Sequence, residues 1–205
     1  YAAAAAATGG DFALGSVGAG LGATTATLKG GIGSASARTQ DGVTVAAIAV
    51  VNAVGVTNVG DGPHFWAAPF EQNNEFGGRG LPASFTPGML TARLKGGADA
   101  TSVENTTLAV VTTDAVLTKP QAKRLAMLAQ TGFARAIYPV HAPMDGDVVF
   151  AAATCVKPID PLIGLTELGM IAANVVARSI ARGVYEATAL PFAGALPGWK
   201  AKFGG

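Results

Sequence analysis

An almost uninterrupted apolar run at residues 43–51, Val-Thr-Val-Ala-Ala-Ile-Ala-Val-Val, restricts the possible folds of this chain more than any other stretch. A short run of this kind, rich in β-branched residues, predicts a central strand that is buried on both faces. The run ends at Asn52, whose side-chain amide needs hydrogen-bond partners at such a position. Those partners are either a turn backbone or a reacting group, and the position by itself favours the turn.

Four further segments have the patterns of regular elements. Strand-like residues follow positions 106 and 148. A capping box at residues 118–121 starts a helix that ends before Pro139, and a second helix is predicted at residues 166–185. The chain has 205 residues, of which 50% are hydrophobic and 13% charged, so it can bury one sizeable core. We therefore predict a single domain of the α/β class.

Composition excludes several function classes. A net charge of +1 leaves no basic face for nucleic acid, and no apolar run is long enough to predict a membrane span. The single Cys155 allows neither a disulfide nor a cysteine-based metal site, so we expect a cytoplasmic protein. His64 and His141 are too far apart in sequence to form a zinc site. Gly18 and Gly20 nearly fit a dinucleotide fingerprint, but the strand and helix that should flank it are missing. We expect no cofactor and no metal.

The first residues have the pattern of a helix end. Tyr1 and six alanines precede Thr8-Gly9-Gly10, and a glycine commonly stops a helix at its C-terminus. There is no initiator methionine, and the basic start of a signal peptide is missing. We therefore expect that a further segment precedes this chain.

Residues 57–103 change in composition to Gly, Pro, Asn, Asp and isolated aromatic residues. So long a segment without periodicity is uncommon inside a domain, and it usually indicates a mobile or functional loop. Its place directly ahead of the next strand fits a chain end that is released by cleavage.

Thr106 stands where this loop meets the strand-like run at residues 106–113. A hydroxyl here can attack the carbonyl just before it, that of Asn105, through a five-membered ring. Hydrolysis of the resulting ester would cut the chain and leave Thr106 with a free α-amine. Such an amine, with an ordinary pKa of about 8, can accept the hydroxyl proton at neutral pH. The alternative is an ordinary strand-edge threonine, which the Asn-Thr-Thr sequence alone favours.

Several groups of residues occur in a characteristic order. They are Gly18-Ala19-Gly20, Lys29-Gly30-Gly31-Ile32-Gly33 with Ser36, residues 49–55, Asn105-Thr106-Thr107-Leu108 through Thr113-Asp114, and residues 141–150. Taken together they resemble the DmpA-like L-aminopeptidase/D-esterase family, which includes β-peptidyl aminopeptidases and nylon-oligomer (6-aminohexanoate oligomer) hydrolases. The resemblance covers almost the whole chain except the loop at residues 57–103.

The resemblance implies a four-layer α/β/β/α sandwich, made as a precursor that cleaves itself between Asn105 and Thr106. Thr106 would be the N-terminal nucleophile, with its own amine as the base. Asn52, at its strand end, would donate its amide to the tetrahedral oxyanion. Losing one such donor typically lowers the rate about 100-fold or more.

Asp145 and Asp147 flank a glycine at the start of a predicted strand. This pattern fits an Asx turn, a metal corner or an acid/base pair, and no neighbouring ligands support the metal. The resemblance matches the two residues to an acidic or hydroxyl pair that orients the nucleophile and its ammonium group.

Lys29 is the one charge in a run of small side chains. Its spacing alone favours a solvated loop lysine over a group aimed into a pocket. The resemblance instead matches it to a lysine near the nucleophile of the nylon-oligomer hydrolases, so Lys29 is included among the candidate catalytic residues.

The same resemblance implies two subunits from one chain. Residues 1–105 would be the C-terminal part of an α subunit, including the loop at 57–103, and residues 106–205 would be the β subunit. Family members carry a long N-terminal segment ahead of this point and commonly form tetramers of the cleaved heterodimer. We therefore expect a homo-oligomer that hydrolyses small peptides or amides, with 6-aminohexanoate-type oligomers among the candidate substrates.

Two alternatives remain open. One is acyl transfer, as in ornithine acetyltransferase, which resembles this family in its fold and its cleaved threonine. The other is an uncut chain that serves as a structural subunit or a binding module.

Overall fold

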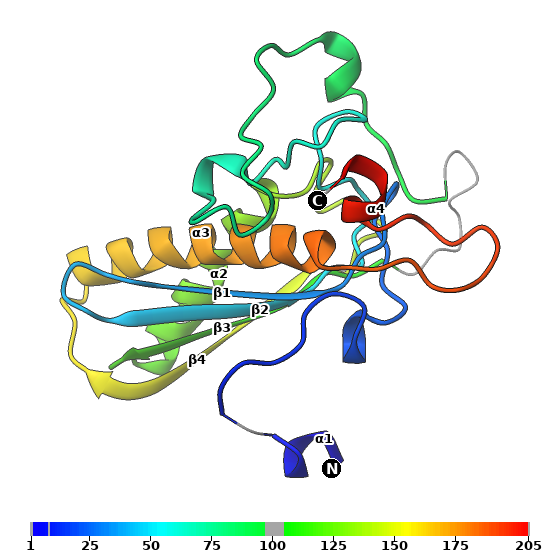
Figure 1. The fold of residues 1–205 in the computed structure, drawn as a ribbon. Helices are drawn as coiled ribbons and strands as arrows, with labels where there is room; N and C mark the ends of the chain where they lie inside the picture. Colours follow the sequence, from blue (N-terminus) through cyan, green and yellow to red (C-terminus); the bar gives the residue numbers. More distant parts are fainter. Residues whose placement is uncertain (1, 8, 97–104, 205) are drawn as a thin grey trace.

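The computed structural model describes residues 2–7, 9–96 and 105–204 (Figure 1). Its helices and strands are, in chain order, α1 (Ala2–Ala5), β1 (Ile32–Arg38), β2 (Thr44–Val50), β3 (Leu108–Ala115), α2 (Lys119–Ala134), β4 (Val148–Lys157), α3 (Ile163–Tyr185) and α4 (Trp199–Phe203). Short 3₁₀ helices lie in the loops at Gly18–Gly20, Ala68–Phe70 and Pro87–Leu90.

The strands form one mixed sheet in the order β1-β2-β3-β4. The pairs β1–β2 and β2–β3 are antiparallel, while β3 and β4 are parallel and joined by α2 as the crossover helix. Val50 pairs with Leu108, and Leu108 pairs with Val148. The end of β2 and the starts of β3 and β4 therefore meet at one end of the sheet, which brings three predicted site segments together.

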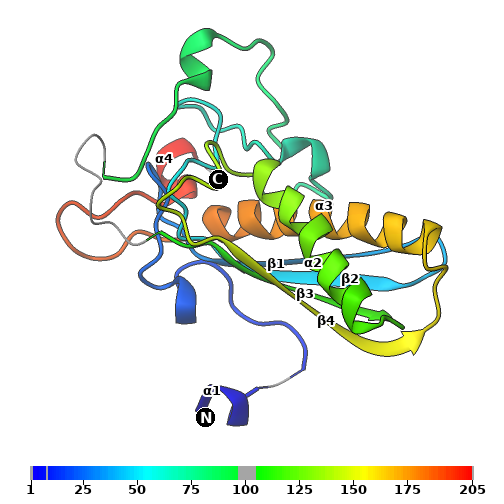
Figure 2. The ribbon, with the colours of Figure 1, turned by 180° about the vertical axis from the view of Figure 1, so that it is seen from behind.

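The two long helices pack side by side on one face of the sheet (Figures 1 and 2). The predicted capping box is confirmed: the Thr118 side chain accepts from the Gln121 amide, and the Gln121 side chain accepts from the Thr118 amide. The helix predicted from residue 166 begins at Ile163, because the Asp160 carboxylate accepts from the first free amides, those of Leu162 and Ile163.

The central helix α3 is long and apolar enough to cross a membrane by length and composition alone. However, 56% of its most apolar window is buried inside the structure, and it packs on β1, β2 and α2. This is the packing of a core helix. The core contains side chains from both sides of the 105–106 bond, among them Val45, Val111 and Val176.

The opposite face of the sheet differs from our expectation that residues 43–51 are buried on both faces. Burial alternates along β2, and Ile48 remains 41% exposed. Ile48, Val110 and Phe150 lie opposite one another on adjacent strands and are all exposed. The expectation was wrong for this chain because the described residues supply only one sheet and one helical layer, two of the four layers predicted.

Small residues let the helix approach the sheet closely. A Cβ added at Gly33 of β1 would lie 2.0 Å from the carbonyl oxygen of Ser179 in α3. One added at Gly31 would lie 2.5 Å from the carbonyl oxygen of Gly183. Any side chain at these positions would push α3 away from the sheet.

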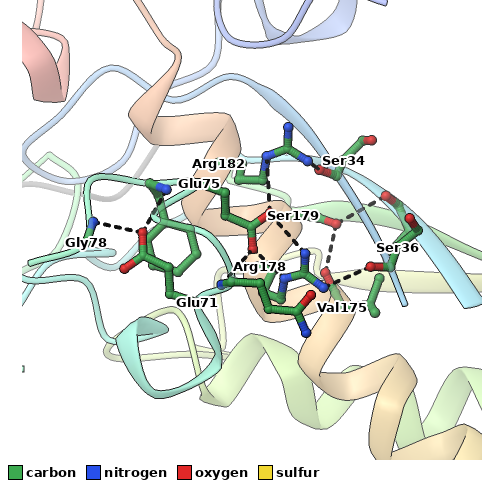
Figure 3. Close-up of polar contacts among 12 residues, drawn as sticks. Ser34, Ser36, Glu71, Glu75, Gly78, Val175, Arg178, Ser179 and Arg182 are labelled. Carbon is green, nitrogen blue, oxygen red and sulfur yellow. Dashed lines mark hydrogen bonds and ion pairs between the residues drawn. The ribbon is translucent and has the colours of Figure 1, made fainter. Parts of the chain in front are cut away.

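The segment from residue 57 to 96 has no α-helix or strand but is tied to α3 (Figure 3). Glu75 pairs with Arg178, which also donates to the Ser36 carbonyl of β1, and Glu71 accepts from the Gly78 amide. The indole of Trp199, fully buried, donates to Pro63 at 3.1 Å. Residues 97–103 of the predicted loop lie outside the described residues, and its mobility stays a prediction.

Candidate active site

Thr106 lies two residues before β3, beside the end of β2. Its hydroxyl donates to the carbonyl oxygen of the preceding residue, Asn105, across 2.5 Å. The same carbonyl oxygen accepts a second hydrogen bond, 2.9 Å long, from the Gly146 amide. The Thr106 amide donates to the Asn52 carbonyl at 3.0 Å. The carbonyl group next to the Thr106 hydroxyl is therefore already polarised by a backbone donor.

Gly146 fits this position because it has no side chain. A Cβ placed there would lie 2.6 Å from Thr106 Oγ1 and 3.4 Å from the Asn105 oxygen. The sequence contained Gly146 between the two predicted acids, but it gave no signal that the backbone of this glycine would face the threonine. The contact depends on the pairing of residues 105 and 145 across two chain segments.

Asn52 follows β2 and turns its side chain into the site. Its Oδ1 accepts from the Thr24 amide at 3.1 Å and from the Lys95 ammonium at 2.8 Å. These two donors fix the orientation of the amide group, because Nδ2 cannot face an ammonium. Asn52 is thus bonded to a turn backbone and to a charged group, and its contact with a reacting group stays a prediction.

A cavity of about 340 Å³ opens beside these residues. Its lining combines Asn52 and Thr106 with small or apolar neighbours, namely Ala19, Gly22, Ala23, Val50 and Leu108. Among the residues that the structure describes, no charged side chain is part of this lining. A short, uncharged group can therefore lie against the threonine hydroxyl.

Asp145 and Asp147 form an acidic corner directly beyond the 105–106 bond. Burial, then the neighbouring charge of Asp147, raises the pKa of Asp145 to about 6. Asp147 has different partners: its Oδ1 accepts from the Thr107 amide at 2.8 Å, and its Oδ2 lies 3.0 Å from Nδ1 of His141. The two carboxylates therefore have different surroundings. Asp147 accepts a hydrogen bond from a backbone amide, whereas the pKa of Asp145 lies close to neutral pH.

Lys29 is buried, with 1% of its surface exposed, so the solvated loop lysine that its spacing favours is wrong. Its ammonium donates to three backbone carbonyls, those of Gly20, Ala23 and Gly30, at 2.5 to 3.0 Å. Burial lowers its pKa to about 8. These bonds use all three ammonium hydrogens and hold the loop that lines the cavity. A catalytic role for Lys29 stays a prediction.

Lys95 was missed by the sequence analysis. It lies in the long loop, where nothing in the local pattern distinguishes it from an ordinary surface lysine. Burial lowers its pKa to about 8, with Asp145 opposing and Lys29 adding to that shift. The structure thus brings together Thr106, Asn52, the acidic corner and a lysine that comes from the segment ahead of the Asn105–Thr106 bond.

Metal ligands do not gather at this site. Across residues 2–7, 9–96 and 105–204, no group of three or more His, Cys, Asp or Glu side chains could hold a metal ion. The polar groups in the site are a hydroxyl, an amide, two carboxylates and an ammonium, which are the groups of acid, base and nucleophilic chemistry.

This fold is shared with solved aminopeptidases, one of which is described as a variant among the Ntn hydrolase fold. A Burkholderia sp. beta-aminopeptidase has a TM-score of 0.66 and 25% identity, covering 98% of this chain and 54% of that one. An L-aminopeptidase D-ala-esterase/amidase from Ochrobactrum anthropi, described as a variant among the Ntn hydrolase fold, has a TM-score of 0.60 at 20% identity. That match covers 88% of this chain and 47% of the other, and shows the fold alone.

The sequence profile of peptidase family S58 matches residues 1–195, and the chain belongs to this family. An uncharacterized aminopeptidase of Mycobacterium tuberculosis is 39% identical over an alignment of 211 positions that covers 98% of this chain and 60% of that protein. One of Mycobacterium leprae is 39% identical over an alignment of 201 positions that covers 91% of this chain and 54% of that protein. The predicted DmpA-like resemblance and α/β class are confirmed, and the chain spans about 60% of the Mycobacterium tuberculosis relative.

Proposed function

We propose that the protein is a self-cleaving amide hydrolase, an aminopeptidase that acts on small peptides or amides after cutting its own chain between Asn105 and Thr106. One observation carries the proposal: the Thr106 hydroxyl is hydrogen-bonded to the carbonyl of the bond that it would cut. The aminopeptidase names of the relatives support the reaction class.

The uncut chain needs an external base, because the nitrogen of Thr106 is then an amide without basicity. The acidic corner supplies carboxylates beside the bond. In the proposed step, the Thr106 oxygen bonds to the Asn105 carbonyl carbon while its proton passes to Asp145, and the Gly146 amide together with the side-chain amide of Asn52 stabilises the oxyanion. The C–N bond then breaks, the nitrogen takes that proton, and water hydrolyses the ester to an Asn105 carboxylate and a free Thr106 hydroxyl.

After the cut, Thr106 carries its own α-amine next to the hydroxyl. The amine takes the hydroxyl proton as the oxygen attacks a substrate amide, and it returns the proton to the leaving amine. Asn52 donates its side-chain amide to the substrate oxyanion. The acyl group of the substrate lies in the cavity of small apolar residues, and water releases it.

Replacement of Thr106 by alanine tests the proposal. We expect wild-type full-length protein to show two pieces on a denaturing gel, and N-terminal sequencing to give a second terminus reading Thr-Thr-Leu-Ala. Thr106→Ala should show one uncut species and lose turnover of an aminoacyl ester or amide, because both reactions use the same oxygen. Thr106→Ser keeps that oxygen and is the matched control, which should still be cut.

Three other results would contradict the proposal or favour one of the alternative functions. Cutting that persists in Thr106→Ala removes this residue from the mechanism. Cut protein that transfers an acyl group to an added amine in place of water would assign it to the acyl transferases. Wild-type protein that remains uncut would support the structural-subunit alternative.

The assembly and location of the protein are also proposals. The exposed row of Ile48, Val110 and Phe150 is an apolar sheet face of the kind that a second sheet covers. The relatives are longer than this chain. We propose that further parts of the full-length protein supply the other two layers, and that the cleaved heterodimers form a cytoplasmic tetramer.

A further inference from the structure

Lys95 lies in the loop ahead of the scissile bond, ten residues before Asn105. Its backbone amide donates to the Val54 carbonyl at 2.8 Å, just beyond Asn52. Its ammonium continues into the site and donates to Asn52 Oδ1, also at 2.8 Å. Two hydrogen bonds, one from the backbone and one from the side chain, therefore seat this residue on the segment that follows β2.

The bond to Asn52 determines how its amide faces the site. The Thr24 amide and the Lys95 ammonium both donate to Oδ1, so the donor side of the amide is turned away from them. Without the ammonium, Oδ1 loses one of these two donors, and an amide rotated by 180° would present an acceptor to a developing oxyanion. An acceptor there would raise the energy of the transition state.

The ammonium also changes the charge balance of the acidic corner. Among the described residues, the charged groups that face it are Asp145, which raises the pKa of Lys95, and Lys29, which lowers it by less. Asp145 in turn faces Asp147, whose Oδ2 also lies 3.0 Å from Nδ1 of His141. The positive charge of Lys95 lowers the pKa of Asp145 against burial and the charge of Asp147, which both raise it.

We propose that Lys95 is a positioning residue for self-cleavage, which orients the Asn52 amide and holds a positive charge beside Asp145 while the chain is still uncut. This inference rests on the proposed function. It assigns the loop ahead of the bond a part in cutting: the segment that the cut turns into a new chain end carries one of the groups that prepares the cut.

The test follows the rate of cutting in full-length protein. Label is incorporated during a short cell-free synthesis, the reaction is diluted into buffers from pH 5 to 10, and cut and uncut chains are separated on denaturing gels. The variants are Lys95→Met, Lys95→Arg and the control Lys157→Met. Lys157 is a matched lysine, ion-paired to Asp114 at 3.1 Å near the far end of β3. Circular dichroism melts in the Thr106→Ala background report folding.

We expect Lys95→Met to cut about 10-fold more slowly or worse, since it disturbs one oxyanion donor without deleting it. The acid limb of its pH–rate profile for cutting should move to higher pH, because the positive charge that lowers the pKa of Asp145 is gone. Lys95→Arg keeps the charge, so the ratio of its rate to the wild-type rate should rise above pH 8, where Lys95 loses its proton. A lysine that only supports the fold would change the melting temperature and leave these pH profiles unchanged.

Two outcomes would overturn the inference and are distinguishable. If wild type cuts and Lys95→Met cuts at the same rate with the same acid limb, Lys95 has no part in cutting and the proposed function stands. If wild type itself is never cut, the proposed function fails and the role of Lys95 fails with it. Lys157→Met should match wild type throughout, and an equal slowing in this control would also reject a specific role for Lys95.

Discussion

Two lysines lie near Asn52, the buried Lys29 and the half-buried Lys95, and their surroundings differ. Lys29 donates to three backbone carbonyls, and Lys95 donates to one side-chain amide beside an acid. Burial lowers both pKa values to about 8. The first lysine holds the loop that lines the cavity, whereas the second contacts Asn52 and lies beside Asp145, two residues with proposed roles in the chemistry. The same residue type, with a similarly lowered pKa, is thus expected to support the backbone on one side of the site and to supply a positive charge on the other.

The largest effect that sharpens this comparison is expected on the side of the site that holds Lys95 and the acidic corner, from Gly146→Ala. The added Cβ would lie 2.6 Å from Thr106 Oγ1, so the hydroxyl must move. A misplacement of about 1 Å at a reacting group lowers rates by about 100-fold, and we expect cutting to slow by at least that much. Gly88→Ala, where no atom lies within 4 Å of the added Cβ, is the matched control on the same denaturing gel. Normal cutting in Gly146→Ala would exclude the observed contact from the reaction.

A smaller effect is expected on the side of the site that Lys29 supports, from Lys29→Met. Three carbonyls lose a charged donor inside the protein, which should lower the free energy of unfolding by about 3 kcal/mol or more. Thermal melts in the Thr106→Ala background measure this loss, and Lys95→Met should lose much less. If Lys29→Met is instead as stable as its parent, and the same substitution slows cutting in the protein that keeps Thr106, then Lys29 acts in the chemistry and its catalytic assignment gains support.

The smallest effect should come from Asp145→Asn in the same uncut background. The raised pKa of Asp145 means that this group costs no stability below its unfolded value near pH 4, and weakens the fold as pH rises through about 6. The variant should therefore melt a few degrees higher than its parent at pH 7, with no such gain at pH 4. An equal gain at both pH values would show that ionisation of Asp145 is not the cause.

Sequence patterns predicted the parts of this fold whose signals are local. The capping box at Thr118 and the strand that follows Thr106 depend on neighbouring residues, and both are present in the structure. The resemblance placed Asn52 and the acidic pair near Thr106, and the pairing of β2, β3 and β4 shows why they meet. Their catalytic roles remain predictions.

The sequence predictions were wrong or incomplete where the surroundings of a residue come from segments that are distant in sequence. Lys29 has the spacing of a surface lysine, and only the folded loop gives it three carbonyl partners. Lys95 has no motif, because its partner Asn52 lies 43 residues earlier in the chain. The apolar run of β2 did not reveal that Ile48 would remain exposed, since that depends on what covers the second face.

The position of the proposed cut within the sheet has a practical consequence. β2 belongs to the piece before the Asn105–Thr106 bond and β3 to the piece after it, yet the two strands are adjacent and joined by six register pairs from Val45↔Thr113 to Val50↔Leu108. Severing the bond leaves this ladder untouched. Gel filtration or native electrophoresis would therefore report one particle of unchanged size before and after maturation, and only conditions that dissolve the sheet would separate the halves.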